Sequence, residues 1–439
     1  MTERIGGPAR KGRISRVEPS HRDAGTVYVS LDRHQDDDFA PYLFVSRDFG
    51  ETWKSLATGL PPVGWINVVK EHPKAVHVLF AGTETGLFVS LDGGAGWTRF
   101  THGFPTVPVD DLVVHPRDQD LIVGTHGRAI YVLDDVSVVA GLTAEVAASE
   151  LHLFAPRPAM VFQPWKHESY SAQRAFVGPN PPYGAIITYH VKTASKAPAA
   201  ITIRDDEGNV VRTLEGKAEA GFNRVVWDLR GPAPAVLTGQ RGPLVVPGTY
   251  AAAVRVGERE SKATLTVTPD PLVQVSDADR RLRYQFLTDL LALNAGLAGA
   301  GTDLRAVRDQ LTALEDQMKR AANAPPTVVE AAARLGQTLA DLQARVGGGG
   351  GGGGEEGGGG GGGGLRGRAS ALFGELDGSG IHQGTLTGPT AGQRQRFEAL
   401  RSDALTLRTA IDRALDVDLA TLNGEIAKHN VPRLVRPRP

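Results

Sequence analysis

A short pattern, S-x-D-x-G-x-x-W, occurs twice near the start of this 439-residue chain, at residues 46–53 and again at residues 90–97, 44 positions later. Each copy follows a short apolar run, at residues 42–45 and 86–89. Asp can bond the backbone amides of a turn and Gly can adopt positive φ, so the pattern predicts the turn of a β-hairpin. The residues predicted to have this structural role are Ser46, Asp48, Gly50, Trp53, Ser90, Asp92, Gly94 and Trp97.

The repetition extends beyond the turn. The pair 72–73 (His-Pro) recurs at 115–116, and the pair 82–83 (Gly-Thr) recurs at 124–125. A period of this length is typical of the blades of a β-propeller. Three blade-like units are predicted, at residues 13–57, 64–100 and 108–135. The third has lost the Ser, the Gly and the Trp of the pattern, as expected of a degenerate or terminal blade.

The two patterns resemble the Asp-box, also called the bacterial neuraminidase repeat, which occurs in sialidases, sortilin-type propellers and photosystem assembly propellers. Residues 37–42 and 124–135 resemble large bacterial secreted proteins that are often labelled glycosyl hydrolases with a sortilin-like N-terminal domain. Residues 176–185 and 372–378 are similar to the C-terminal part of those proteins. The resemblance implies a periplasmic or secreted protein with further blades upstream.

Two or three blades are too few to close a propeller and would leave exposed sheet edges. We therefore expect this chain to be a C-terminal fragment, or to complete its ring with another polypeptide. Residues 1–12 are basic and lack the apolar stretch of a secretory signal. If Met1 is the authentic start, the sequence alone indicates a cytoplasmic protein.

Composition narrows the classes of function. A hydrophobic content of 41% and a charged content of 22% permit buried cores, and the length suggests two to four domains. The formal net charge of −1 gives no global attraction to nucleic acid or to an anionic membrane. There is no cysteine, which excludes disulfides, thiolate catalysis and cysteine-ligated zinc. No apolar run is long enough for a transmembrane helix.

The fold class predicted is mainly β with an α-helical C-terminal region. Short alternating strands dominate the middle of the chain and include a hairpin signal at residues 205–209, which favours an immunoglobulin-like β-sandwich. The expected domains are a partial propeller at 1–140, a connector at 141–175, the sandwich at 176–270, a helical hairpin at 276–346, a disordered glycine-rich linker at 347–364, and a C-terminal helical segment with a frayed tail at 365–439.

The helical prediction depends on apolar stripes at a spacing of three and four residues. One stripe runs from Leu282 to Leu297 and another from Leu304 to Met318; the pattern continues from Ala332 to Val346, and a final helix is expected from Phe397 to Ile426. They indicate an antiparallel helical hairpin or bundle. An intramolecular core explains them, and so does a coiled coil through which the chain self-associates.

Candidate ligand-binding residues are His126, Arg128 and Trp65. His126 and Arg128 flank a glycine between two predicted strands, where a titrating group would lie beside a fixed cation. Trp65 lies in a connection between blades, free to present its ring on one face. The alternative is that the pair only closes a tight turn. We expect the acidic residues 36–38 to form a solvated loop, and the alternative is that they bind a cation.

No catalytic residue, metal ligand set or cofactor motif is predicted. The histidines do not show zinc spacing, and no nucleophile elbow, phosphate loop or dinucleotide fingerprint occurs. The sequence therefore favours a non-catalytic extracytoplasmic scaffold that binds a protein, a peptide or a glycan. The alternative is a sialidase-like glycosyl hydrolase whose catalytic residues lie mostly in blades outside this chain, and a third reading is a cytoplasmic assembly factor.

Overall fold

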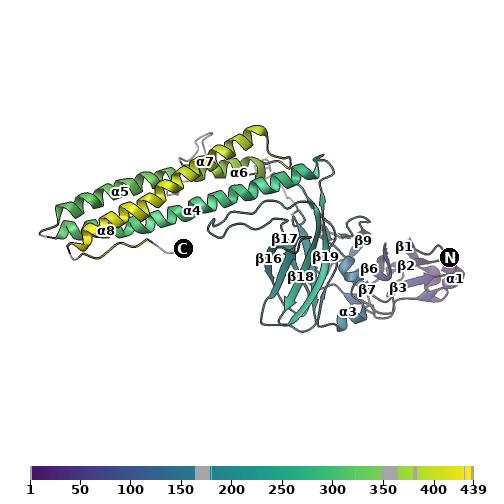
Figure 1. Ribbon diagram of the computed structural model, residues 1–439. Coiled ribbons are helices and arrows are strands. Elements are labelled where there is room, and N and C mark those ends of the chain that lie inside the picture. Colours follow the sequence, from purple (N-terminus) through teal and green to yellow (C-terminus); the bar gives the residue numbers. More distant parts are fainter. Residues whose placement is uncertain are drawn as a thin grey trace.

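The computed structural model describes residues 2–163, 178, 180–321, 323–347, 364–378, 383–429 and 431–436. The predicted fold class is confirmed: the chain is mainly β, with a helical region at its C-terminal end (Figure 1). Part of the predicted 176–185 motif and nearly all of the predicted glycine-rich linker lie outside the described residues.

Three antiparallel sheets, each with its strands in sequence order, form the N-terminal part of the chain. Helix α1 (Thr2–Ile5) and the 3-10 turn η1 (Gly7–Lys11) precede them. Sheet 1 contains β1 (Arg13–Pro19), β2 (Val27–Arg33), β3 (Asp38–Ser46) and β4 (Lys54–Ser55), with the turn η2 (His34–Asp36) between β2 and β3. Sheet 2 contains β5 (Ile66–His72), β6 (Ala75–Thr83), β7 (Gly86–Ser90) and β8 (Thr98–Arg99). Sheet 3 contains β9 (Val109–Val114), β10 (Leu121–Thr125) and β11 (Ile130–Leu133).

The sheets pack face to face, as the blades of a propeller do. Successive side chains of a strand point to opposite faces, so Val69 of β5 packs in the core shared with sheet 1, whereas Val68 packs in the core shared with sheet 3. Strand β5 contacts both β1 and β9, and Arg16 of β1 is paired with Asp111 of β9. The first strands of the three sheets therefore converge along one line.

Close approach of the backbone accounts for one repeated glycine. A Cβ atom on Gly82 of β6 would lie 2.6 Å from side-chain carbons of both Val68 and Val109, so no larger residue fits there without displacing the neighbouring sheet. At the equivalent Gly124 the nearest atoms would be 3.7 Å away, in ordinary contact. Because β10 belongs to the last sheet, no further sheet among the described residues packs against that position.

A two-sheet sandwich follows, joined to sheet 3 through α2 (Ser137–Ala140) and α3 (Ala144–Ala148). One sheet has the order β12 (Leu151–Leu153), β14 (Ala185–Val191), β17 (Gly221–Trp227). The other has the order β13 (Ala159–Val161), β19 (Arg259–Pro269), β18 (Gly248–Val256), β15 (Ala199–Arg204), β16 (Val210–Gly216). Trp227 and Tyr189 are fully buried in the core between them. Strands β12 and β13 lie in residues predicted as a connector, and β13 is too short for a periodicity to reveal it.

The helical region begins with α4 (Asp277–Arg320), which is about 66 Å long and runs along the whole helical region in Figure 1. It is followed by α5 (Pro326–Val346), α6 (Leu365–Asp377), α7 (Ala391–Arg413), the π-helical turn η3 (Ala414–Asp418) and α8 (Leu419–Ala427). The apolar stripes of these helices form one shared core. Side-chain caps fix two helix starts, Ser276 for α4 and Thr390 for α7. Within the described ranges, no helix has the length and apolar character needed to span a membrane.

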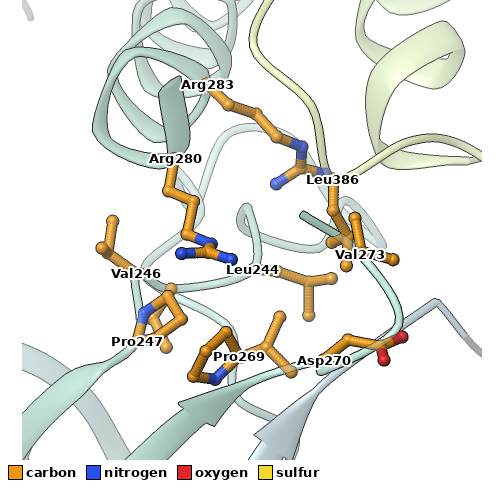
Figure 2. Close-up of a pocket in the computed structure, with 11 residues that line it drawn as sticks. Leu244, Val246, Pro247, Pro269, Asp270, Val273, Arg280, Arg283 and Leu386 are labelled. Carbon is orange, nitrogen blue, oxygen red and sulfur yellow. The ribbon is translucent and has the colours of Figure 1, made fainter. Parts of the chain in front are cut away.

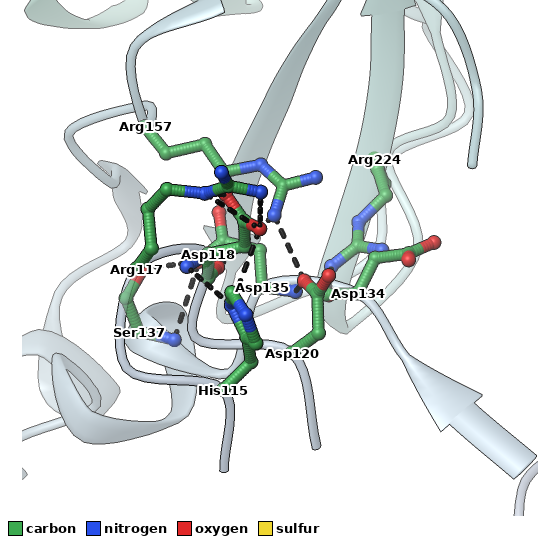
Figure 3. A network of polar contacts seen from close by, with 9 residues as sticks. All are labelled: His115, Arg117, Asp118, Asp120, Asp134, Asp135, Ser137, Arg157 and Arg224. Carbon is green, nitrogen blue, oxygen red and sulfur yellow. Dashed lines mark hydrogen bonds and ion pairs between the residues drawn. The ribbon is translucent and has the colours of Figure 1, made fainter. Parts of the chain in front are cut away.

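Ionic contacts hold the sandwich against sheet 3 (Figure 3). Arg157 Nη1 lies 2.8 Å from Asp120 Oδ1 and donates to the carbonyl of Asp118 at 3.0 Å. Arg224 of β17 donates to the carbonyl of Asp134 at 3.0 Å. Burial, with a smaller contribution from the nearby Asp120 carboxylate, raises the pKa of Asp134. Asp134, whose pKa is raised, therefore lies in the contact between sheet 3 and the sandwich.

Candidate functional site

The candidate site is a row of side chains along the end of the stacked sheets where β5 and β9 begin. We call it the rim row and define it by Asp32, His34, Phe39, Trp65, Asn67, Asp110 and His126, which come from all three sheets or from the loops that adjoin them. Asp32, His34 and Phe39 come from the end of β2, the turn after it and the start of β3. The start of β5 and the residue before it supply Asn67 and Trp65, and β9 and the β10–β11 hairpin supply Asp110 and His126.

Trp65 forms the centre of an aromatic group. Its ring centroid lies 4.6 Å from that of His34 at an interplanar angle of 30°, and 6.2 Å from that of Phe39. Gly64, at φ +126°, precedes the tryptophan and donates its backbone N–H to the carbonyl of Phe39 at 2.8 Å. That bond ties the entry of sheet 2 to β3 of sheet 1. The group is half-exposed, with Phe39 at 42%.

A buried carboxylate holds His34 in place. Asp32 Oδ2 lies 2.7 Å from His34 Nδ1, and Asp32 Oδ1 accepts from the backbone N–H of His34 at 2.9 Å. Asp32 is only 9% exposed, so its remaining capacity for ligands is small. The pair fixes the orientation of the imidazole against the indole.

Asn67 connects the aromatic group to sheet 3. It accepts from Trp65 Nε1 at 2.9 Å through Oδ1, and its amide Nδ2 donates to the carbonyl of Val109 at 3.2 Å and to Asp110 Oδ1 at 3.4 Å. Asp110 Oδ2 in turn lies 3.1 Å from His126 Nδ1. The structure therefore brings Trp65 and His126, two of the three predicted binding residues, into one continuous row.

Arg128, the third predicted residue, does not join the row. It is exposed in the β10–β11 hairpin, where Gly127 and Ala129 both have positive φ. Thr125 closes this hairpin by donating from its backbone N–H, at 3.2 Å, and from its hydroxyl, at 2.6 Å, to the carbonyl of Ala129. A binding role for Arg128 stays a prediction.

The two S-x-D-x-G-x-x-W turns lie at the opposite end of the sheets from the rim row. In the first, Gly50 N donates to Ser46 Oγ at 2.8 Å, and Thr52 donates to both carboxylate oxygens of Asp48. These bonds, with that of the Thr52 hydroxyl first, lower the pKa of Asp48 to about 2. Trp53 Nε1 donates to the carbonyl of Gly50 at 3.1 Å.

The second turn has the same geometry. Gly94 N donates to Ser90 Oγ at 2.8 Å, and Gly96 N donates to Asp92 Oδ1 at 2.9 Å. Burial opposes ionisation of Asp92, but the hydrogen bonds from the Gly96 N–H and the Ser90 hydroxyl to this carboxylate outweigh it and lower its pKa. Trp97 differs from Trp53 because its indole donates to Leu56 O of the preceding unit, at 2.8 Å.

Two of the three acidic residues at 36–38 are paired with Arg33. Arg33 Nη1 lies 2.7 Å from Asp38 Oδ2, which also accepts from the Tyr42 hydroxyl at 2.8 Å. Arg33 also reaches Asp36, at 3.4 Å. Among the described residues no group of three or more histidine and carboxylate side chains is arranged to hold a metal ion.

Five residues of the rim row were missed by sequence reasoning, namely Asp32, His34, Phe39, Asn67 and Asp110. One signal could have found two of them. Asn67 and Asp110 are separated by the same 43 residues as His72 and His115, so they occupy equivalent positions in successive units. Hydrogen-bonding side chains at equivalent positions meet at one end of neighbouring sheets.

Comparisons with known proteins give no family. No family model and no curated protein match the sequence. Solved structures with partial overlap include a GH74 enzyme from Niastella koreensis (12% identity, 57% of this chain, 46% of that chain, TM-score 0.23), a GH74 xyloglucanase from Xanthomonas campestris (15%, 57%, 36%, 0.21) and an extracellular domain from B. thetaiotaomicron (11%, 58%, 37%, 0.19). The overlap spans less than half of each of these solved chains. At these TM-scores the likeness carries no functional argument.

Chemically, the rim row combines an apolar platform with adjoining polar groups. The rings of Trp65 and Phe39 present half-exposed flat surfaces, while Asn67, Asp110 and His126 supply donors and acceptors along one direction. Such an arrangement suits a ligand that has a flat apolar face and several hydroxyl groups.

Proposed function

We propose that the chain is a non-catalytic, extracytoplasmic binding protein whose rim row binds a glycan. The observation that carries the proposal is the half-exposed aromatic group centred on Trp65, which continues through Asn67 into Asp110 and His126. A pyranose ring has a face of C–H groups that packs on an indole, and its hydroxyls pair with amide, carboxylate and imidazole groups. A peptide ligand would instead require a free sheet edge or an apolar groove at this site.

The state of the carboxyl groups favours binding over hydrolysis. A glycosidase needs a carboxylic acid with a raised pKa opposite a second carboxylate. Among the described aspartates and glutamates, the raised pKa belongs to Asp134, at the far end of β11 in the contact with the sandwich. Asp32 and Asp110 are each paired with a histidine. The pairing of both rim-row carboxylates with imidazoles supports a binding role for these residues.

The proposal includes the division into residues 1–140, 141–175, 176–270, 276–346, 347–364 and 365–439, with the sandwich and the helices acting as a scaffold for the blades. It also includes the periplasmic or secreted location that the Asp-box resemblance implies. Completion of the ring by blades outside this chain would extend the same surface around the axis.

Binding to an array of neutral and sialylated oligosaccharides tests the proposal, followed by titration calorimetry on the best ligand. We expect Trp65→Ala to weaken binding tenfold or more, since a central aromatic contact contributes about 2 kcal/mol. Phe49→Ala is the matched control, because Phe49 is a 79% exposed aromatic at the opposite end of β3. A chain that binds no glycan, or a Trp65→Ala variant with unchanged affinity, would refute the site, and release of new reducing ends would favour the hydrolase alternative.

A further inference from the structure

The junction between the sandwich and α4 is closed. Figure 2 shows the small cavity there, which Arg280 and Arg283 help to line. Arg280 pairs with Asp277 at 2.9 Å, and Arg283 donates to the carbonyls of Thr385 and Leu376. The cavity has a volume of about 20 Å³, which is room for a single water molecule. This junction therefore presents no surface to a partner, in contrast to the outer faces of the stacked sheets.

Sheet 3 exposes an apolar face on the side that points away from sheet 2. Ile130 is 69% exposed, Val132 is 56% exposed and Val113 is 46% exposed. They alternate along their strands with Tyr131 and Leu112, which pack in the core shared with sheet 2. A contiguous apolar patch of this kind marks an interaction site, whereas single exposed apolar residues are ordinary.

The repeat shows what covers such a face. Leu87 and Val89 of β7 pair with β6 in the same register in which Ile130 and Val132 of β11 pair with β10. Leu87 is only 2% exposed and Val89 only 8%, because both lie in the core between sheets 2 and 3. The exposed face of sheet 3 is therefore the counterpart of a face that the next sheet buries.

A glycine marks the place where a covering sheet would fit. A Cβ atom on Gly82 would lie 2.6 Å from Val109 of the next sheet, so the inner strand of that sheet fills the space. Gly124 has the same register position in sheet 3, but its nearest atoms would be 3.7 Å away. Its φ is not positive either. Nothing within the chain requires a glycine at 124, whereas a further inner strand would require one.

The other end of the stack carries the matching face. Ile14 and Val17 of β1 are 39% and 44% exposed. Their register equivalents in β5, Ile66 and Val69, are buried in the core with the preceding sheet. Ile14 also corresponds to Val109, the residue that packs over Gly82. Strand β1 is thus equipped to pack on a sheet that precedes it.

Helix α1 covers the outer strands of sheet 1 and leaves β1 open. Arg4 pairs with Glu51 at 2.6 Å, and Ile5 packs in the cluster that contains Phe44 and Trp53. Sheet 3 has three strands and no counterpart of the outer strands β4 and β8. The part of sheet 1 that α1 leaves open therefore matches the strands that sheet 3 possesses.

We propose that two copies of this chain close one ring of six sheets, in which sheet 3 of each copy packs on sheet 1 of the other. Ile14 of one copy lies over Gly124 of the other, as Val109 lies over Gly82 within one chain. Propellers typically have about four to eight blades, and one copy supplies three sheets, two copies six and three copies nine. Two copies are therefore the number that fits. A twofold axis relates the two contacts, and the proposal is independent of the ligand of the rim row.

The mass of the full chain in solution tests the ring, measured by light scattering over a dilution series. We expect a dimer for the wild type. Gly124→Val fits the free sheet but collides with the second copy, so we expect the dissociation constant to rise by about tenfold or more. Gly248→Val is the matched control, because a Cβ atom on this strand glycine of the sandwich would meet nothing within 4 Å.

A mixing experiment tests which faces meet. Val132→Glu and Ile14→Glu should each weaken the dimer, because each places an unpaired charge in both contacts. When the two variants are mixed, native mass spectrometry should find a heterodimer, since one of its two contacts then joins the two unaltered faces. Val210→Glu is the control, because Val210 is 48% exposed on β16 of the sandwich. Self-association through the helices would not show this complementation.

Circular dichroism confirms that each variant is folded, and if Val132→Glu fails to fold, Gly124→Val still gives the answer. A wild-type chain that stays monomeric at its highest soluble concentration would overturn the proposal. So would a dimer that both Val132→Glu and Gly124→Val leave intact, two variants that do not combine, or an assembly of three copies.

Discussion

The imidazole of His34 lies 4.6 Å from the indole of Trp65, centroid to centroid, across the contact between the first two sheets. His34 follows the last residue of β2, and Trp65 precedes the first residue of β5. Two sheets thus contribute one aromatic surface, and Asn67 extends it to the third sheet through Asp110. The rim row depends on how the sheets stack, so it should respond to changes that leave each sheet intact.

Asn67→Ala should lower both the stability of the protein and its affinity for a glycan, because Asn67 links the residues of the rim row. The substitution removes the acceptor of the Trp65 indole N–H and the donor to the Val109 carbonyl, and we expect a loss of about 1–2 kcal/mol in the free energy of unfolding. Glycan affinity should fall several-fold. Urea denaturation and calorimetry measure the two effects, with Gln337→Ala on the exposed face of α5 as the control. Unchanged stability would mean that the bridge contributes nothing.

His72 should make the protein sensitive to mild acid. The residue is 1% exposed, and burial, followed by the nearby charges of Lys74 and His77, lowers its pKa from 6.5 to about 4. A lowered histidine pKa means that the folded state favours the neutral ring, so stability is fully present above pH 6.5 and is lost as the pH falls toward 4. One pKa unit corresponds to about 1.4 kcal/mol, which gives a total loss of roughly 3 kcal/mol.

His72→Asn is expected to remove most of this dependence between pH 6.5 and 4, since the asparagine oxygen can still accept from the backbone N–H of Lys74. Denaturation midpoints at half-unit pH steps measure it. The exposed His102, changed to Asn, serves as the control and should leave the slope in place. If the wild-type curve were flat over this range, the assignment to His72 would be wrong.

Asp48 should contribute to stability in more acidic solution. Its pKa is lowered from 3.8 to about 2, chiefly by the Thr52 hydroxyl. A lowered carboxyl pKa stabilises the fold above pH 3.8, and this contribution disappears as the pH falls toward 2. An NMR titration of the Asp48 carboxyl should show the midpoint directly. Asp48→Asn should lower the Tm at pH 7, whereas Asp206→Asn, in another exposed hairpin, should not.

Asp377→Ala should be far more damaging than its position outside the β-region suggests. It leaves Arg230 and Arg283 buried without their shared partner, and loss of one member of a buried ionic group costs about 3–5 kcal/mol. Asp403→Ala is the matched control because the Arg368–Asp403 pair is half-exposed, where a pair contributes about 1 kcal/mol or less. Chemical denaturation compares them, and equal losses would show that burial of the first group is unimportant.

Local sequence patterns, namely apolar runs beside turns and apolar stripes at helical spacing, predicted much of the architecture. Short apolar runs predicted the strands that precede the two Ser-Asp-Gly-Trp turns, because a run of this length bounded by turn residues is typical of a buried strand. Apolar stripes at helical spacing predicted the region that α4 to α8 occupy, although α4 proved to be one continuous helix of 44 residues. Strands β12 and β13 were missed because three residues are too few to show a period, and their pairing partners, β14 and β19, are distant in sequence.

The candidate site was predictable only in part. Trp65 and His126 were named from the sequence, and the tertiary structure joins them through Asn67 and Asp110. Arg128 was named beside His126, yet residues of one hairpin can point in different directions, and within the described residues the contact with Asp110 is made by His126. The acidic residues 36–38 drew attention by their density, but Arg33 neutralises two of them within the loop.

By itself the sequence determined the type and order of the elements, because turn chemistry, strand alternation and helical periodicity are local properties of a few neighbouring residues. Only the tertiary structure decided which polar side chains meet. The rim row joins residues as far apart as Asp32 and His126, and the buried ionic group joins Arg230 to Asp377. Such encounters depend on the stacking of sheets and the docking of helices, which the whole hydrophobic core sets and no short pattern encodes.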